Sequence, residues 1–167
     1  MRDSFVSALS NAASSVAVVT SAGEAGMAGS TVSSFCSVSA DPPTLLACIH
    51  KQSALAQTIE ANGRFCLNLL TQEQSRESDV FAGRIKAPDG NKFSLVDWHE
   101  SDLGQPVINH SLASFDCKVS KIVDGESHWV LIGTVMKVHQ GTDSVDSLIY
   151  CQRAYVTTSV LSSSVAA

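Results

Sequence analysis

The sequence predicts a mainly β protein with short helices, folded as an antiparallel barrel. Most apolar residues fall in β-branched runs of strand length, and turn signals such as Asp124-Gly125 separate these runs. Helical periodicity is confined to two or three short segments. Strands joined by hairpins, without regular β-α-β alternation, favour a closed antiparallel sheet with helices packed outside.

Length and charge limit what the chain can be. It has 167 residues, 16% of them charged, and a formal net charge of −5. We expect one domain over residues 1–160 and a flexible tail over residues 161–167. The negative charge and the absence of a lysine or arginine run argue against binding to a nucleic-acid backbone. The low charged fraction suggests that some surface is buried against another chain.

The N-terminus and the cysteines point to a reducing compartment. Residues 1–15 lack the apolar core of a secretory signal, and no segment approaches the roughly 20 apolar residues of a membrane span. The five cysteines form no CxxC pair and lie mostly in apolar runs. We expect buried free thiols, no metal site, and a soluble cytoplasmic protein without a membrane partner.

The first half of the chain predicts a helix and three strands. Residues 3–12 predict a short packed helix with Phe5 and Leu9 on one face. Residues 15–24 predict a strand that enters a hairpin. The stretch 29–43 predicts one continuous strand ended by its two prolines, and residues 42–50 supply the next strand. Alternation along the hydroxyl-rich strand places one set of residues on a polar face and the other toward the core. The polar set is Thr31, Ser33, Phe35, Ser37 and Ser39, and the core set is Val32, Ser34, Cys36 and Val38.

The rest of the chain alternates two helices with further strands. Residues 53–63 predict a helix with a serine cap and a glycine stop, followed by a strand at 64–70. Residues 71–83 predict a polar helix, and 84–94 a loop. Three β segments complete the chain. The first two, 111–125 and 127–141, form the clearest hairpin, and 147–158 is a last strand or strand pair with Arg153 and Tyr155 on one face.

The residues alone do not define a reaction. The sequence has no GxGxxG, P-loop or GxSxG motif. Lys51 and Ser53 lie before a helix N-terminus, which is a natural anion position, although a solvated loop lysine is favoured on the residues alone. His128 opens a strand, at the surface or beside a pocket. A Cys36–His128 pair is conceivable, but a structural cysteine is favoured. These observations indicate a barrel with a hydroxyl-rich strand and no more.

A run of motifs across residues 3–157 resembles the flavin reductase-like proteins, which have the FMN-binding split barrel fold. The motifs are GSTVSSFCSVSADPPTLLACIHKQSAL, NGRFCLNLL, FAG, the KF of GNKFSL, GQPVINHSLASFDCKV, SHWVLIGTV and LIYCQRAY. The resemblance is greatest to reductase components of two-component aromatic monooxygenases, such as those paired with 4-hydroxyphenylacetate or chlorophenol hydroxylases.

The resemblance implies hydride transfer from NADH or NADPH to FAD or FMN, with the reduced flavin diffusing to a separate oxygenase. It also implies a homodimer with flavin sites near the subunit contact. The flavin itself carries the reactive chemistry, so no catalytic acid or base is obligatory. The alternative is a split barrel that binds flavin or heme permanently and does not reduce free flavin.

The resemblance also implies which residues contact the cofactors. The hydroxyl-rich strand would follow the flavin ring and ribityl chain, the strand after it would flank the ring, and Lys51 with Ser53 would meet the phosphate. A loop would close the site, and His128 would lie near the nicotinamide. YCQRAY stands where the family often has YYRGRY, so Arg153 is displaced by one position. The implied contacts are Thr31, Val32, Ser33, Ser34, Phe35, Ser37, Cys48, Ile49, His50, Lys51, Ser53, Phe81, Lys92, Phe93, His128, Arg153 and Tyr155.

Overall fold

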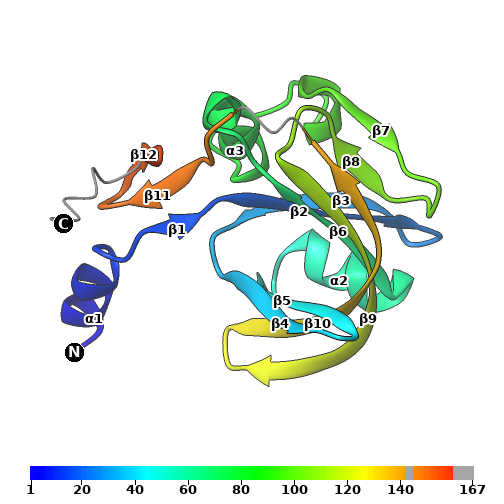
Figure 1. The fold of residues 1–167 in the computed structure, drawn as a ribbon, viewed down its shortest axis with the longest axis horizontal. Helices are drawn as coiled ribbons and strands as arrows, with labels where there is room; N and C mark the ends of the chain where they lie inside the picture. The colour runs from blue at the N-terminus through cyan, green and yellow to red at the C-terminus, as the bar shows by residue number, and fades with distance from the viewer. Residues whose placement is uncertain (142–144, 160–167) are drawn as a thin grey trace, which may run out of the picture.

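One seven-stranded antiparallel sheet curls into a split barrel, as Figure 1 shows. The computed structural model describes residues 1–141 and 145–159, so the expected tail at 161–167 lies outside the described residues. The strand order is β3-β2-β6-β9-β10-β5-β4, which confirms the predicted fold class. The strands are β2 (Ala17–Gly23), β3 (Gly26–Val32), β4 (Phe35–Ala40), β5 (Pro43–His50), β6 (Arg64–Leu69), β9 (Ala113–Gly125) and β10 (His128–Gln140).

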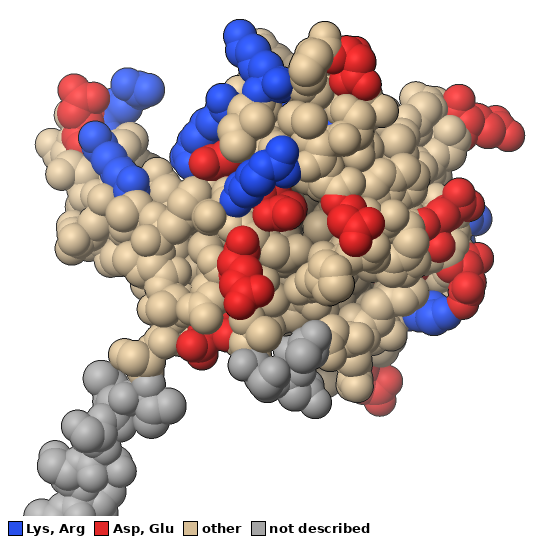
Figure 2. Space-filling view, turned by 90° about the horizontal axis from the view of Figure 1, so that it is seen from above, with Lys and Arg blue, Asp and Glu red and all other residues tan. Residues whose placement is uncertain are grey.

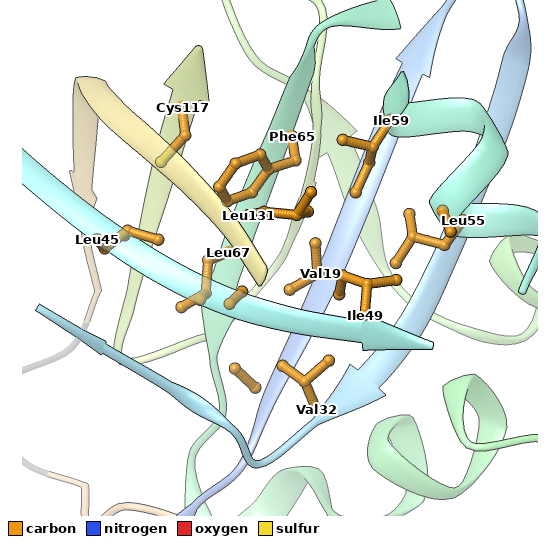
Figure 3. Packing of buried hydrophobic residues seen from close by; sticks show 13 residues of the cluster. Val19, Val32, Leu45, Ile49, Leu55, Ile59, Phe65, Leu67, Cys117 and Leu131 are labelled. Carbon is orange, nitrogen blue, oxygen red and sulfur yellow. The ribbon is translucent and has the colours of Figure 1, made fainter. Parts of the chain in front are cut away.

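The barrel core gathers apolar side chains from the sheet and from helix α2 (Ala54–Asn62), which lies inside the curve of the sheet (Figures 1 and 3). Ser53 caps α2 and Gly63 ends it at φ 65°, as predicted. Its Leu55 and Ile59 point toward Val19 and Ile49, so this helix contributes to the core and does not merely cover the outside.

The hydroxyl-rich stretch is not one continuous strand, and the predicted faces are wrong beyond its midpoint. The chain bends at residues 33–34, where it passes from edge strand β3 to edge strand β4. The bend changes the phase of the alternation. Val32 and Phe35 therefore pack against the core, whereas Cys36 and Val38 are exposed. Only Pro42 lies in the connection, because Pro43 is the first residue of β5, a position that proline tolerates.

Three elements form an arm beside the barrel, at the left of Figure 1. They are α1 (Arg2–Leu9), β1 (Ser14–Ser15) and the hairpin of β11 (Ile149–Cys151) and β12 (Ala154–Val156). Helix α1 has no buried residue, and Phe5 and Leu9 are 63% and 58% exposed. The expectation that this helix packs is therefore wrong for the isolated chain. It projects from the barrel, so its apolar face meets solvent.

A short hairpin of β7 (Trp98–Glu100) and β8 (Pro106–Ile108) covers the outer face of the sheet, and the sequence did not predict it. Thr20 Oγ1 donates to the Pro106 carbonyl at 2.6 Å, and the Ile108 amide donates to Asn68 Oδ1 at 2.9 Å. These buried hydrogen bonds fix the hairpin to β2 and β6.

The remaining helices follow the prediction closely. The polar segment 71–83 folds as a 3-10 turn, η1 (Gln72–Gln74), and helix α3 (Ser75–Phe81), and the loop after it contains a second turn, η2 (Lys92–Leu95).

Only Cys66 and Cys117 are buried, so the expectation of buried thiols fails for the other three cysteines. Among the described residues, no helix is long and apolar enough to cross a membrane.

Candidate functional site

Three hollows lie along one segment of the chain, residues 27–34, which comprises most of β3 and the bend and which we call the shared wall. We call them the loop hollow, the histidine hollow and the tyrosine hollow. The loop hollow measures about 500 Å³, the histidine hollow about 210 Å³ and the tyrosine hollow about 190 Å³. β3 is an edge strand of the sheet, and most of this segment is half-buried or exposed.

The histidine hollow brings together three segments that are far apart in the sequence. Residues 30–34 face Cys48, Ile49 and His50 of β5 and His128 of β10. His50 and His128 are directly opposite in the β5–β10 ladder, and their ring centroids are 5.1 Å apart. Burial, and then the nearby Cys36, raises the pKa of the Cys48 thiol, so this thiol remains protonated at neutral pH. The hollow presents hydroxyls, backbone groups and two imidazoles.

The loop hollow contains a half-buried cation. Lys92 Nζ donates to the Phe81 carbonyl at 2.8 Å and to the Gly29 carbonyl at 3.4 Å. Burial lowers the pKa of this ammonium, and it forms no ion pair within the described ranges. Ala54, the first residue of α2, lies on the same hollow. An ammonium near a helix N-terminus favours an anionic group here.

Lys51 and Ser53 are engaged elsewhere. Lys51 forms an ion pair with Asp124 and lies 4.5 Å from the ring centroid of Trp129. Ser53 Oγ donates to the His50 carbonyl and accepts from the Ala56 amide, so its hydroxyl caps α2. Neither residue lines any of the three hollows.

A hydrogen-bonded network forms the wall of the tyrosine hollow. The Tyr155 hydroxyl lies 2.8 Å from both Ser78 Oγ and Asp79 Oδ1, and Arg84 donates to that carboxylate at 2.8 Å. Thr31 Oγ1 donates to the Ser78 carbonyl at 2.6 Å. The network therefore joins the arm, α3 and the shared wall.

The same network shifts two pKa values. The Tyr155 hydroxyl, and then Arg84, holds the pKa of Asp79 below its ordinary value. Burial is the main cause that raises the pKa of Tyr155. Both shifts keep the network in one state at neutral pH, with an ionised carboxylate and a neutral phenol.

Of the other residues that the sequence predicts for the site, some line a hollow and some do not. Phe93 lines the loop hollow, whereas Phe81 is buried behind it, with its ring centroid 5.1 Å from that of Phe93. Phe35 packs against the barrel core, and Ser37 lies exposed on β4; neither lines a hollow. Arg153 is in the β11–β12 turn at φ 63°, so it does not share a strand face with Tyr155, contrary to prediction.

Sequence reasoning missed Arg84, Asp79 and Tyr150. Arg84 lies over the rings of Tyr150 and Tyr155, at 5.9 and 5.6 Å from their centroids. Their positions in the sequence could have identified two of them, because Arg84 directly follows the FAG motif and Tyr150 belongs to the LIYCQRAY motif. Among the described residues, no group of three histidine, cysteine or acidic side chains could hold a metal ion.

The arrangement fits an elongated ligand with a planar polar ring and an anionic tail. The histidine hollow can accept a ring edge, the 29–31 backbone can follow a polyol chain, and Lys92 can meet a phosphate. A flavin mononucleotide has these three parts in this order. The donor set therefore fits a flavin on its own chemistry.

Comparison with known proteins gives consistent matches. The sequence pattern of the "Flavin reductase like domain" family matches residues 9–159. The FMN reductase (NADH) RutF of Ancylobacter novellus is 36% identical over 154 residues, covering 92% of this chain and 83% of that protein. The 4-hydroxyphenylacetate 3-monooxygenase reductase component of Pseudomonas aeruginosa is 33% identical, covering 92% of this chain and 90% of that protein.

A solved structure has the same fold. The crystal structure of a nitrilotriacetate monooxygenase component B homologue from Mycobacterium thermoresistibile superposes with a TM-score of 0.86. The two chains are 34% identical, and the match covers 95% of this chain and 87% of the other.

Proposed function

This chain belongs to the flavin reductase-like family, and from that membership we propose that it transfers hydride from NADH to FMN or FAD and releases the reduced flavin to a separate oxygenase. The observation that supports this best is the shared wall at residues 27–34. It connects a ring-sized polar hollow to the Lys92 ammonium, which forms no ion pair in the part of the chain that the structure describes.

Each part of the site has a separate role in this proposal. Lys92 and the start of α2 hold the flavin phosphate, a role that the resemblance implied for Lys51 and Ser53. The hydroxyls and backbone of residues 30–34 hold the polar edge of the ring, with Cys48 and Ile49 beside it. When bound, the flavin supplies the hydride-accepting chemistry. The protein's contribution is to position both cofactors and to exclude water from the ring.

His128 lies where a nicotinamide could approach the ring. It shares the histidine hollow with His50, and its Nδ1 is 2.8 Å from the Ser127 hydroxyl, which fixes the ring orientation. We assign it a positioning role for the nicotinamide. Arg84 lines the tyrosine hollow, whereas Arg153 lines none of the three hollows.

The direct test is NADH oxidation by the purified protein, with and without added FMN, FAD or riboflavin, and with NADPH in parallel. We expect a flavin-dependent rate with NADH, and mostly colourless protein because the flavin is held loosely. No flavin-dependent rate with either nicotinamide would overturn the proposal. Strongly yellow protein without turnover of added flavin would favour a permanent flavin carrier.

We also propose a homodimer in which a second copy covers the arm. An isolated helix of fewer than about 12 residues is marginal in water, and α1 has eight residues with none buried. Figure 2 shows that much of the arm surface on that face is uncharged. Light scattering coupled to size exclusion should give a dimer, and F5D/L9D should give a monomer. A wild-type monomer would overturn this part of the proposal.

The reductase components among the relatives serve separate oxygenases, so we propose such a partner here, reached by diffusion of reduced flavin. The expected setting is the cytoplasm. In Figure 2 acidic and basic side chains are interspersed, so no broad basic area suited to a nucleic acid lies on the face shown.

A further inference from the structure

A fourth cavity, of about 120 Å³, lies on the outer face of the barrel. We call it the outer cavity. Strands β6, β9 and β10 and the loop between β7 and β8 contribute its lining, which includes Arg64, Leu103, Asp116, Lys118 and Met136. It shares no lining residue with the three hollows, so it does not belong to the flavin site.

Two exposed cations at this cavity form no ion pair within the described ranges, although the carboxylate of Asp116 lines the same cavity. Arg64 and Lys118 are directly opposite each other in the β6–β9 ladder, and like charges in such positions destabilise a sheet. Within the described ranges neither forms an ion pair, although Lys51 and Lys137 each have an acidic partner. An anion that lies between Arg64 and Lys118 would relieve this repulsion.

A buried carboxylate lies at the same cavity. Asp116 is 1% exposed; its Oδ2 is 2.9 Å from His139 Nε2, while its Oδ1 has no hydrogen-bond partner. The Cys66 thiol is near, since burial and then the charge of Asp116 raise the pKa of this thiol, but a thiol is a weak donor. A buried oxygen without a strong donor is unusual in a folded protein. A hydroxyl group on a ligand would supply the donor.

The apolar lining and the volume of the outer cavity indicate what apolar group a ligand could place there. Leu103 and Met136 are 36% and 58% exposed and present apolar surface. A dry cavity of about 150 Å³ can hold benzene. The outer cavity is slightly smaller and has exposed residues at its mouth, so one ring can enter while a charged substituent stays outside.

We propose that the outer cavity binds a single-ring aromatic carboxylate that carries a ring hydroxyl. The carboxylate lies between Arg64 and Lys118, the ring packs against Leu103 and Met136, and the hydroxyl donates toward Asp116. This binding is independent of flavin reduction, so it can be tested whatever the outcome of the NADH assay.

The test is an NMR titration of the 15N-labelled protein with 4-hydroxybenzoate, with FMN present in excess to occupy the flavin site. We expect saturable shifts at the amides of Arg64, Leu103, Lys118 and Met136, with a Kd on the order of 1 mM for so small a ligand. Benzoate lacks the hydroxyl and 4-hydroxybenzyl alcohol lacks the charge. Each should bind at least about threefold more weakly if both polar contacts form.

Matched variants test the cations. R64Q/K118Q should weaken binding about tenfold, whereas K86Q/K121Q, which loses the same charge away from the cavity, should change the Kd less than about twofold. Three results would overturn the proposal: no saturable shifts, shifts centred on Lys92 or Tyr155, or equal affinity for 4-hydroxybenzoate and the neutral alcohol. Benzoate binding as tightly as 4-hydroxybenzoate would remove Asp116 from the site. The wild-type titration decides the matter even if a variant fails to fold.

Discussion

The barrel and the arm place the same kind of side chain in opposite environments. Phe65 in β6 is fully buried in the barrel core, whereas Phe5 in α1 is 63% exposed. The barrel closes over its apolar side chains by curling one sheet, and α2 fills its interior. The arm has no such interior. The barrel therefore buries its own core, and the β11–β12 hairpin of the arm packs its tyrosines against a second buried cluster, whereas helix α1 leaves its apolar face in solvent.

The largest expected effect comes from a matched pair of phenylalanine truncations. Phe65→Ala should lower the free energy of unfolding by about 3–5 kcal/mol, because the truncation leaves a cavity in a tightly packed part of the core. The Phe65 ring packs so closely on Gly133 that a Cβ added to this glycine would lie 2.7 Å from the ring. Phe5→Ala should change that free energy by less than about 0.5 kcal/mol in the dissociated chain. Urea unfolding followed by circular dichroism measures both.

Measurements at several protein concentrations distinguish a loss of core packing from a loss of subunit contact. If a second copy covers the arm, Phe5→Ala should lower the unfolding midpoint only where the wild type is dimeric. Equal, concentration-independent losses for the two variants would show that the arm is as much a part of the core as the barrel.

The next effect compares two lysines: Lys92, which lines the loop hollow, and Lys51, which lines none of the three hollows. Lys92→Met should raise the Kd for FMN about tenfold or more, because it removes a charged donor from the proposed phosphate position. Lys51→Met should raise it less than about threefold, since Asp124 already pairs with that charge. Fluorescence quenching of FMN measures both constants, and a larger effect for Lys51 would reverse the assignment.

A smaller effect compares the two tyrosines of the arm. Tyr155→Phe removes a hydroxyl that contacts Ser78, Asp79 and Arg84, and should cost about 1 kcal/mol. Tyr150→Phe should cost less than about 0.5 kcal/mol, because no hydrogen bond from its hydroxyl is present in the described part of the structure. Hydrogen exchange in β11 and β12 should increase for the first variant only.

The smallest effect is a pH dependence at the contact between arm and barrel. The pKa of Asp79 is lowered in the folded protein, so its contribution is complete above its ordinary pKa of 3.8. That contribution is lost as the pH falls through the lowered value. The stability difference between wild type and Asp79→Asn should therefore be constant near neutral pH and shrink below about pH 4. A difference that grows on acidification would contradict this assignment.

Much of the fold and part of the site could be predicted from local pattern. Alternation and turn signals identified the β9–β10 hairpin, and Ser53 and Gly63 marked both ends of α2. The motifs correctly indicated that residues 31–34 and 48–50 and His128 belong together, because ladder register places them at one opening.

The structure differs from the sequence-based expectation where the direction of a side chain or strand depends on distant residues. Lys51 follows β5 as predicted, but Asp124 and Trp129 on neighbouring strands turn its side chain away from the hollows. Arg153 falls in a tight turn, and its two-residue reversal separates it from Tyr155. The bend at residues 33–34 reflects barrel closure, which no alternation pattern contains. The β7–β8 hairpin is held by Asn68 and Thr20, which are distant in sequence.

The bend at residues 33–34 has a mechanical consequence. It links the two edge strands of the sheet covalently, and no ladder joins β3 to β5 in the described ranges. The histidine hollow lies between β3 and β5, and two of its lining residues are joined by a backbone hydrogen bond of 2.9 Å, which the Cys48 amide donates to the Ser34 carbonyl. This hydrogen bond fixes the bend to β5, so the covalent link between β3 and β4 and one backbone hydrogen bond together set the width of the hollow.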